Sequence, residues 1–289
     1  MKANALLILV TTATISCNVF AEDVDYNIHG QVSDQKIAEQ RHKLAENIKS
    51  QGFGPQSPRN IDSIKGSNNI SFNAAPAYDK MNLCNIHFHK NAEHTGGEFL
   101  KYAGNGDGHG YLGGYQYSGK LTQAELLAVD HEVCPSKHGS LYPGDTIEVH
   151  YVHSSAQVTP GPTLDACLSE SINNPQLRVE TQVYVLVNDH NARDFGALTD
   201  FGQINGLQQA LNIPNDTGIP VQYAGSTTGP GYNEVGSPFQ VTWSVRPEVT
   251  KVNIATVGEW CKGNVFNEDH AHGVRNLVTN PDLLSTIKR

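Results

Sequence analysis

The sequence predicts a mainly β fold: a single domain around a large, twisted, mostly antiparallel sheet with a few short helices. From residue 83 onward, short stretches of alternating polar and apolar residues are separated by Gly, Asn and Pro, which is typical of antiparallel strands. The chain has 289 residues, of which 27 are Gly and 14 are Pro, so its loops are extensive. Neither an internal repeat nor a linker divides the sequence, and we therefore expect one domain.

Residues 1–21 are predicted to be a secretory signal that is removed after Ala21. They begin with Lys2, continue with an apolar run over 5–10 and end in small residues. The run is too short to cross a bilayer, and a lipidated Cys17 is disfavoured because Thr14 stands where a lipobox has Leu. We therefore expect the mature chain, residues 22–289, to be periplasmic or secreted.

Residues 22–80 are predicted to form an N-terminal helix and a loop segment packed on the sheet. The helix is expected over 33–49, after a cap at Ser33 or Asp34. Its apolar stripe consists of Ile37, Leu44 and Ile48. The segment 54–75 is rich in turn-forming residues, so we expect surface chain laid across the sheet.

Residues 81–289 are predicted to contain the sheet and the functional site, in one domain with 22–80. Seven strands are expected, over residues 83–89, 97–102, 145–153, 178–188, 219–224, 239–245 and 249–256. One further helix is predicted near residues 200–211.

Acidic residues outnumber basic ones. The chain carries 29 acidic and 20 basic residues, and removal of Lys2 with the signal leaves 19 basic residues and a formal charge of −10. This charge is unfavourable for binding nucleic acid or an anionic membrane, so neither is expected as a partner.

Four cysteines remain after the signal is removed: Cys84, Cys134, Cys167 and Cys261. An even number in an exported protein indicates disulfides, and a zinc–thiolate cluster is disfavoured because no CxxC pair occurs. Three pairings are compatible with the sequence, of which we favour Cys134 with Cys167 and Cys84 with Cys261.

The run NLCNIHFHKNAEHTGGEF, residues 82–99, contains candidate metal ligands. In a strand, His87 and His89 project from the same face about 7 Å apart, so both imidazoles can bind one metal ion. The predicted strand over 145–153 places Glu148, His150 and Val152 on one face, and Ile147, Val149 and Tyr151 on the other. If His150 joins His87 and His89, three neutral imidazoles leave a fourth position open for water, as a catalytic zinc site requires.

The other histidines are not expected to bind metal. His153 falls on the opposite face from His150, and the HxH at His270 and His272 lies in a polar run without strand periodicity. The remaining seven are interpreted as mostly solvated surface residues: His29, His42, His94, His109, His131, His138 and His190.

These motifs resemble those of carbonic anhydrases. Residues 82–99 resemble the delta class in particular. Six segments also resemble, in the same order, segments of the alpha class: GPQSPRNID (54–62), IHFHK (86–90), EHT (93–95), IEVHYVH (147–153), YAGSTTGP (223–230) and VTWSV (241–245). The resemblance implies an alpha-class-like architecture. It also implies a zinc enzyme that hydrates CO₂ reversibly to bicarbonate and a proton through zinc-bound hydroxide.

The resemblance also implies roles for individual residues. His87, His89 and His150 would bind Zn²⁺, and Glu148 would accept a hydrogen bond from a ligand histidine. Thr227 or Thr228 would orient the hydroxide and donate a proton to Glu93, for which Glu98 is a rival. Val152, with Val183 or Val185, would form an apolar wall for CO₂, and His94 is the nearest candidate for carrying protons to solvent.

Two other classes of function are weighed against this one. A cupin would use His87, His89 and Glu93 to bind iron or manganese for oxygenase or isomerase chemistry, but Met81 and Leu100 stand where its flanking glycines are expected. An exported, non-catalytic protein that stores or senses zinc would need no threonine–glutamate pair and no apolar pocket. Carbonic anhydrase is favoured over both, and the sequence indicates no oligomeric state.

Overall fold

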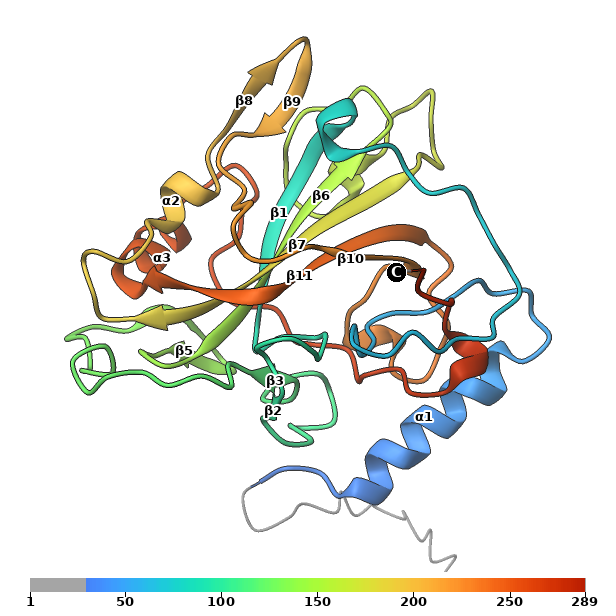
Figure 1. Ribbon diagram of the computed structural model, residues 1–289, viewed down its shortest axis with the longest axis horizontal. Helices are drawn as coiled ribbons and strands as arrows, with labels where there is room; N and C mark the ends of the chain where they lie inside the picture. Colours follow the sequence, from blue (N-terminus) through green and yellow to red (C-terminus); the bar gives the residue numbers. More distant parts are fainter. Residues whose placement is uncertain (1–29, 289) are drawn as a thin grey trace, which may run out of the picture.

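The computed structural model of the chain describes residues 30–288, and its centre is a five-stranded sheet (Figure 1). In order across the sheet, the strands are β1 (Asn82–Lys90), β6 (Thr146–Ser154), β7 (Leu177–Val187), β11 (Gln240–Asn253) and β10 (Val221–Ser226). Neighbouring strands are antiparallel except β7 and β11, which are parallel. The predicted mainly β fold with a mostly antiparallel sheet is therefore confirmed.

Three small two-stranded sheets and a few short helices surround the central sheet. The small sheets pair β2 (Lys101–Tyr102) with β3 (Tyr115–Gln116), β4 (Val133–Ser136) with β5 (Gly139–Leu141), and β8 (Phe201–Ile204) with β9 (Leu207–Ala210). The α-helices are α1 (Asp34–Ile48), α2 (Phe195–Leu198) and α3 (Ile254–Cys261). Single 3₁₀ turns are η1 (Tyr78–Lys80), η2 (Leu164–Cys167), η3 (Pro230–Tyr232) and η4 (Pro281–Leu283).

The central sheet separates two apolar cores. Ile147, Val149 and Tyr151 face the core that α2 and α3 cover, whereas Val152 faces a second core with Val179 and Trp243. Because successive side chains of a strand point to opposite faces, the alternation in β6 assigns His150 and Glu148 to the side of the second core. The predicted faces of this strand are thus confirmed.

The N-terminal helix agrees with its prediction. Ser33 caps α1, since its side chain accepts a hydrogen bond from the Lys36 N–H. The stripe of Ile37, Leu44 and Ile48 is buried, and the last two residues pack against Val278 and Leu284 of the C-terminal segment.

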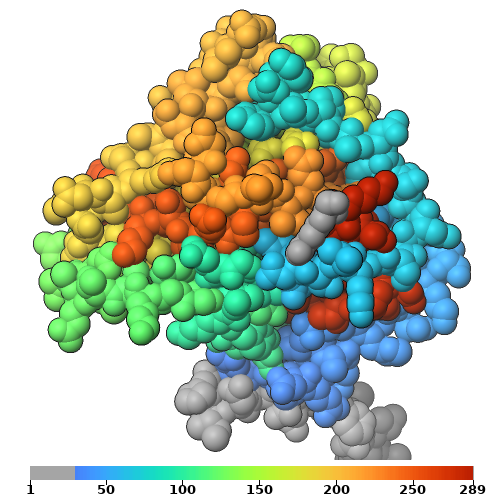
Figure 2. All heavy atoms as spheres, viewed as in Figure 1, coloured from blue at the N-terminus to red at the C-terminus, as the bar shows by residue number. Residues whose placement is uncertain are grey.

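Residues 54–61 are not the surface chain that their turn-rich composition predicts. Gln56, Ser57, Arg59 and Ile61 are each 0% exposed. Polar residues can be buried here because their hydrogen bonds are satisfied, as by the bonds from Arg59 Nη2 to the carbonyl oxygens of Ser63 (2.7 Å) and Lys65 (2.8 Å). The Gln56 N–H donates to Leu283 O at 2.7 Å. The exposed chain that follows this segment lies beside the C-terminal segment at the surface (Figure 2), where the Ser67 N–H donates to Pro281 O at 2.8 Å.

The helix predicted near residues 200–211 is wrong, because this stretch forms the hairpin of β8 and β9. Its turn is Asn205–Gly206, with φ values of 52° and 81°. Positive φ at both positions matches a type I′ turn, which favours hairpin closure over helix continuation. Two strand predictions also change: only residues 101–102 of the stretch 97–102 form a strand, and 249–256 continues β11 to Asn253, where α3 begins.

The favoured disulfide pairing is also wrong. The bonds join Cys84 to Cys167 and Cys134 to Cys261. Cys84 and Cys167 belong to the second core, whereas Cys134 and Cys261 belong to the core beneath α3. The sheet lies between these pairs, so the predicted cross-pairing would have to pass through it.

Among residues 30–288, no helix is long and apolar enough to span a bilayer. The predicted signal over 1–21 and His29 lie outside the described residues.

Candidate metal centre

Strand register brings the three candidate histidines together. In the antiparallel pairing of β1 with β6, His87 lies opposite His150 and His89 lies opposite Glu148. The centroid of the His150 ring is 5.0 Å from that of the His87 ring and 4.7 Å from that of the His89 ring. His150 is about sixty residues from His87 and His89 in the sequence. The three side chains nevertheless form one cluster on one face of the sheet.

The ring nitrogens of this cluster fit a metal ion. Each of the three histidines offers one nitrogen, and these atoms lie within 4.8 Å of one another. His89 Nε2 is buried and has no hydrogen-bond partner within residues 30–288, and His150 Nδ1 is 3.2 Å from His87 Nε2. A buried nitrogen left without a partner is costly, and a shared cation would satisfy all three nitrogens.

The opposite nitrogen of each ring already has an oxygen partner. His87 Nδ1 is 2.6 Å from Asn85 Oδ1, and His89 Nδ1 is 2.9 Å from Gly273 O. His150 Nε2 is 2.7 Å from Glu148 Oε1. An N–H donated to each oxygen fixes the tautomer and ring orientation, as in most histidine metal sites.

Burial keeps these imidazoles neutral. It lowers the pKa of His87 and of His150 below the usual value, and it lowers the pKa of His89 to about 4. Neutral histidines are the form that binds a metal ion, so the cluster is ready for one at neutral pH.

Glu148 sits at the centre of a buried network behind the cluster. Burial would raise its pKa, but His94 and His150 together lower it well below the usual range. His94 is 0% exposed, with Nδ1 2.7 Å from Glu148 Oε1 and Nε2 2.7 Å from the Tyr223 hydroxyl. The expectation that His94 is a solvated surface residue is therefore wrong.

Of the two candidate glutamates, only Glu93 lies near the candidate threonines. It is 1% exposed, and its Oε1 accepts a hydrogen bond from the Arg275 N–H at 2.9 Å. Burial raises its pKa, and the nearby Thr228 side chain acts in the opposite direction. Glu93 Oε2 is buried and has no hydrogen-bond partner within residues 30–288. Glu98 is exposed and accepts instead from the Val249 N–H at 2.8 Å.

The two threonines have different surroundings. Both line the cavity in front of the histidines. Thr227 Oγ1 is 2.5 Å from Ser237 Oγ, whereas the Thr228 side chain lies near enough to Glu93 to lower the pKa of that carboxyl group.

The cavity in front of the histidines has a volume of about 490 Å³. One wall is apolar and consists of Val152, Leu164, Leu177, Val179, Val241 and Trp243. Val152 is where the sequence predicts it, whereas Val183 and Val185 lie outside the lining. The polar part of the lining, called the polar wall below, includes His270, His272 and Glu268.

His272 lies beside the cluster, which its polar sequence context did not predict. It forms a β-bridge with His89, and its ring centroid is 5.2 Å from that of His87. Its Nε2 lies 2.6 Å from Glu268 Oε2; burial lowers its pKa, but Glu268 more than reverses this and the pKa is raised. The HxH spacing was a usable signal, but its polar loop context concealed the contact.

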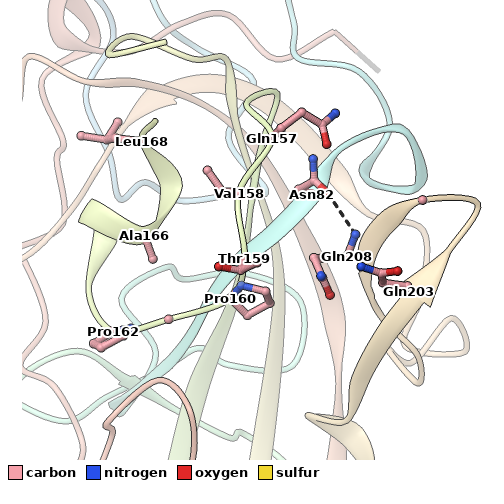
Figure 3. A pocket seen from close by; sticks show the side chains of 12 residues that line it. Asn82, Gln157, Val158, Thr159, Pro160, Pro162, Ala166, Leu168, Gln203 and Gln208 are labelled. Atoms are coloured by element: carbon pink, nitrogen blue, oxygen red, sulfur yellow. Dashed lines mark hydrogen bonds between the residues drawn. The ribbon is translucent and has the colours of Figure 1, made fainter. Parts of the chain in front are cut away.

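A second, larger cavity of about 760 Å³ lies apart from the histidines, between the loop 157–168 and the β8–β9 hairpin (Figure 3). Its lining combines side-chain amides with proline and small apolar residues, and the Gln208 N–H donates to Asn82 Oδ1 at 3.0 Å across it. None of its lining residues is a histidine or a carboxylate, so this cavity offers none of the ligands that the histidine cluster offers.

Comparisons with solved structures find alpha-carbonic anhydrases. The enzyme from Thermovibrio ammonificans, in complex with sulfanilamide, is 18% identical, with a TM-score of 0.27 over 80% of this chain and 86% of that one. The enzyme from Photobacterium profundum is 18% identical, with a TM-score of 0.25 over 85% and 95%. A carbonic anhydrase from Chlamydomonas reinhardtii, in complex with acetazolamide, is 17% identical, with a TM-score of 0.28 over 80% and 89%.

The sequence itself matches a family. No curated protein sequence matches the chain, but the family model described as delta carbonic anhydrase matches residues 78–256, more than half of the chain. The matched region contains β1 and β6 with all three clustered histidines. The chain belongs to the delta carbonic anhydrase family.

Proposed function

We propose that this carbonic anhydrase holds a zinc ion on His87, His89 and His150 and uses it for the reversible hydration of CO₂ to bicarbonate and a proton. The observation that carries the proposal is the convergence of three ring nitrogens whose opposite nitrogens are all engaged by oxygen acceptors. Three imidazoles with no carboxylate among the ligands suit zinc. When bound, zinc lowers the pKa of a coordinated water to about 7, the value general to carbonic anhydrase zinc.

Thr228 and Glu93 orient the attacking oxygen in this proposal. The Thr228 hydroxyl donates a hydrogen bond to the Glu93 carboxylate. Only its oxygen lone pairs then remain available. It can therefore accept a hydrogen bond from the attacking oxygen, which directs that oxygen's own lone pair toward the carbon of CO₂. Thr227 is less suited to this role because its hydroxyl pairs with Ser237.

The apolar wall binds CO₂ and excludes competing water. CO₂ has no hydrogen to donate and little polarity, so it favours the surface of Val152, Val179 and Trp243 over bulk water. Bicarbonate is charged and fits this wall poorly, which favours its release.

The proton released by hydration leaves along the polar wall in this proposal, and not through the enclosed His94. His272 lies beside the cluster, and the His270 ring is 6.3 Å further along. The His270 side chain is 41% exposed, so its imidazole can pass a proton to water.

The protein works in the periplasm or outside the cell, in this proposal. Two disulfides support an oxidising compartment, in keeping with the predicted signal. CO₂ and bicarbonate are its substrates, and the acidic charge makes nucleic acid and anionic membranes unfavourable partners.

Stopped-flow hydration of CO₂, with metal analysis of the same sample, tests the proposal. The zinc-loaded protein should hydrate CO₂ well above the buffer rate, and His150→Ala should lose both zinc and activity. His153→Ala is the matched control, since His153 lies on the same strand but bonds the Tyr151 carbonyl oxygen at 2.9 Å on the other face. It should keep its zinc.

Three results would contradict the proposal. They are buffer-level hydration by the zinc-loaded protein, full zinc stoichiometry in His150→Ala, and bound iron or manganese with oxygen consumption. The last would favour the cupin alternative, which the family match does not support.

A further inference from the structure

A buried arginine lies behind the threonine and glutamate of the proposed site. Arg275 is 1% exposed, and within residues 30–288 its guanidinium bonds uncharged acceptors. Its Nε donates to Tyr232 O at 3.0 Å, Nη2 to Val235 O at 3.3 Å and Nη1 to Ser57 O at 2.7 Å. Burying a cation costs several kcal/mol unless its donors are satisfied. The buried guanidinium therefore favours a structure in which all of these hydrogen bonds form.

The acceptors come from two segments that are distant in sequence. Tyr232 and Val235 belong to the loop 229–237, which directly follows Thr228, and Ser57 belongs to the buried N-terminal segment. Gln56 Oε1 accepts from both Nη atoms at 3.3 Å and also from the Ser237 N–H at 2.8 Å. The guanidinium therefore ties the loop 229–237 to the N-terminal segment at Tyr232 and Val235 and, through Gln56, at Ser237.

The main chain of the same residue holds the other member of the pair. The Arg275 N–H donates to Glu93 Oε1 at 2.9 Å. The side chain thus holds the loop that directly follows Thr228, while the backbone holds the Glu93 carboxylate, the proposed partner of Thr228.

We infer that Arg275 is a positioning residue for CO₂ hydration, which sets the placement of the Thr228 hydroxyl relative to the Glu93 carboxylate. The inference rests on the proposed roles of Thr228 and Glu93. Zinc binding does not depend on it, since the ligands lie on β1 and β6, and Gly273, which bonds His89, is anchored separately through the neighbouring Val274 N–H to Gly110 O (2.6 Å).

The test is a double-mutant cycle of Arg275→Lys with Thr228→Ala, on the zinc-loaded, full-length mature protein. Lysine keeps the charge but cannot fill five donor positions in a fixed fork. We expect kcat of Arg275→Lys to fall about 10- to 100-fold, with KM and zinc content unchanged. In the Thr228→Ala background the same substitution should have no further effect on kcat, because the orientation it supports is already lost.

Arg178→Lys is the matched control. Arg178 is also buried, at 5% exposure, but it pairs with Glu180 at 2.5 Å and contacts neither member of the pair. The kcat of the Arg178→Lys variant should equal that of the wild type. If Arg275→Lys does not fold, Gln56→Ala takes its place in the cycle, because it removes the shared acceptor and leaves the arginine.

Different results would contradict the role of Arg275 and the role of Thr228. A wild-type kcat in folded, zinc-loaded Arg275→Lys, or losses that multiply in the double variant, would overturn the role of Arg275. A wild-type kcat in Thr228→Ala would instead contradict the proposed role of Thr228, on which the inference rests.

Discussion

Three imidazoles are held neutral in a largely buried cluster at the base of the cavity. Each has one nitrogen bonded to a protein oxygen and the other directed at a common point. Protonation of any ring would place a buried cation beside two other imidazoles, and this is why burial lowers the pKa of all three. Folding and metal binding therefore both favour the neutral form of these three imidazoles over the protonated form.

The stability of the metal-free protein should fall as the pH falls from about 6.5 to about 4. The pKa of His89 is about 4 in the folded protein and about 6.5 in an unfolded chain. Between these values the unfolded chain binds more protons, so the free energy of unfolding rises with pH in this window and His89 alone contributes about 3 kcal/mol. Urea unfolding at several pH values, on metal-free protein, measures the slope. A flat profile across the window would contradict the buried neutral state.

The candidate ligands could be predicted from local pattern, but their neighbours could not. Alternation along a strand identifies His87 with His89, and His150 with Glu148, because that period is a property of the extended backbone. The contacts of His94 with Tyr223 and of His272 with His89 depend on how distant segments meet. No local period contains this information, so the positions of His94 and His272 could not be predicted from the sequence.

The two disulfides differ in what they hold. Cys84–Cys167 joins β1 to η2, next to Leu164, which lines the cavity. The neighbouring Asn85 donates from Nδ2 to Gly161 O at 3.0 Å and also contacts His87. Cys134–Cys261 joins β4 to α3 on the other face of the sheet.

Replacing each cysteine pair by serine should separate stability from activity. The bonds close segments of 83 and 127 residues, so removal of either should cost about 4 to 5 kcal/mol of unfolding free energy by the chain-entropy estimate. Only the Cys84/Cys167 variant should also lose zinc affinity and hydration rate, because it releases the cavity loop and the support of Asn85. Equal activity in both folded variants would show that this disulfide has no special bearing on the site.

Strand prediction succeeded where a run alternates and is bounded by turn residues, as in β1, β6 and β7. It failed at residues 200–211, where Leu207 and Leu211 also fit a helical spacing. The Asn205–Gly206 pair closes a hairpin there. A short apolar run is ambiguous between the two periods, and only the turn chemistry decides it.

The metal ion should stabilise the molecule as a whole. A ligand that binds only the folded state at 100 times its dissociation constant adds about 2.7 kcal/mol, which corresponds to roughly 5 to 10 °C in Tm for a chain of this size. Treatment with a chelator should lower Tm by this amount, and added zinc should restore it in calorimetry. His150→Ala should show no zinc-dependent shift; an equal shift would place the stabilising ion elsewhere.

The arrangement of the sheet is the part of the fold that the sequence left open. The expectation of a mostly antiparallel sheet is correct, but strand order and the parallel pairing of β7 with β11 depend on long crossovers. The cysteine pairing failed for the same reason, because the face on which each cysteine lies follows from packing between elements.

The support that Gly273 provides to His89 joins positions 184 residues apart in the chain. During synthesis, β1 and β6 therefore leave the ribosome long before the residue that orients one of the metal ligands exists. The complete arrangement around His89 therefore forms only once the last segment docks, which under the proposed export would be after the chain has left the cytoplasm. Under that proposal the metal supply in the final compartment would decide which ion is bound, because histidine sites alone discriminate weakly among divalent metals.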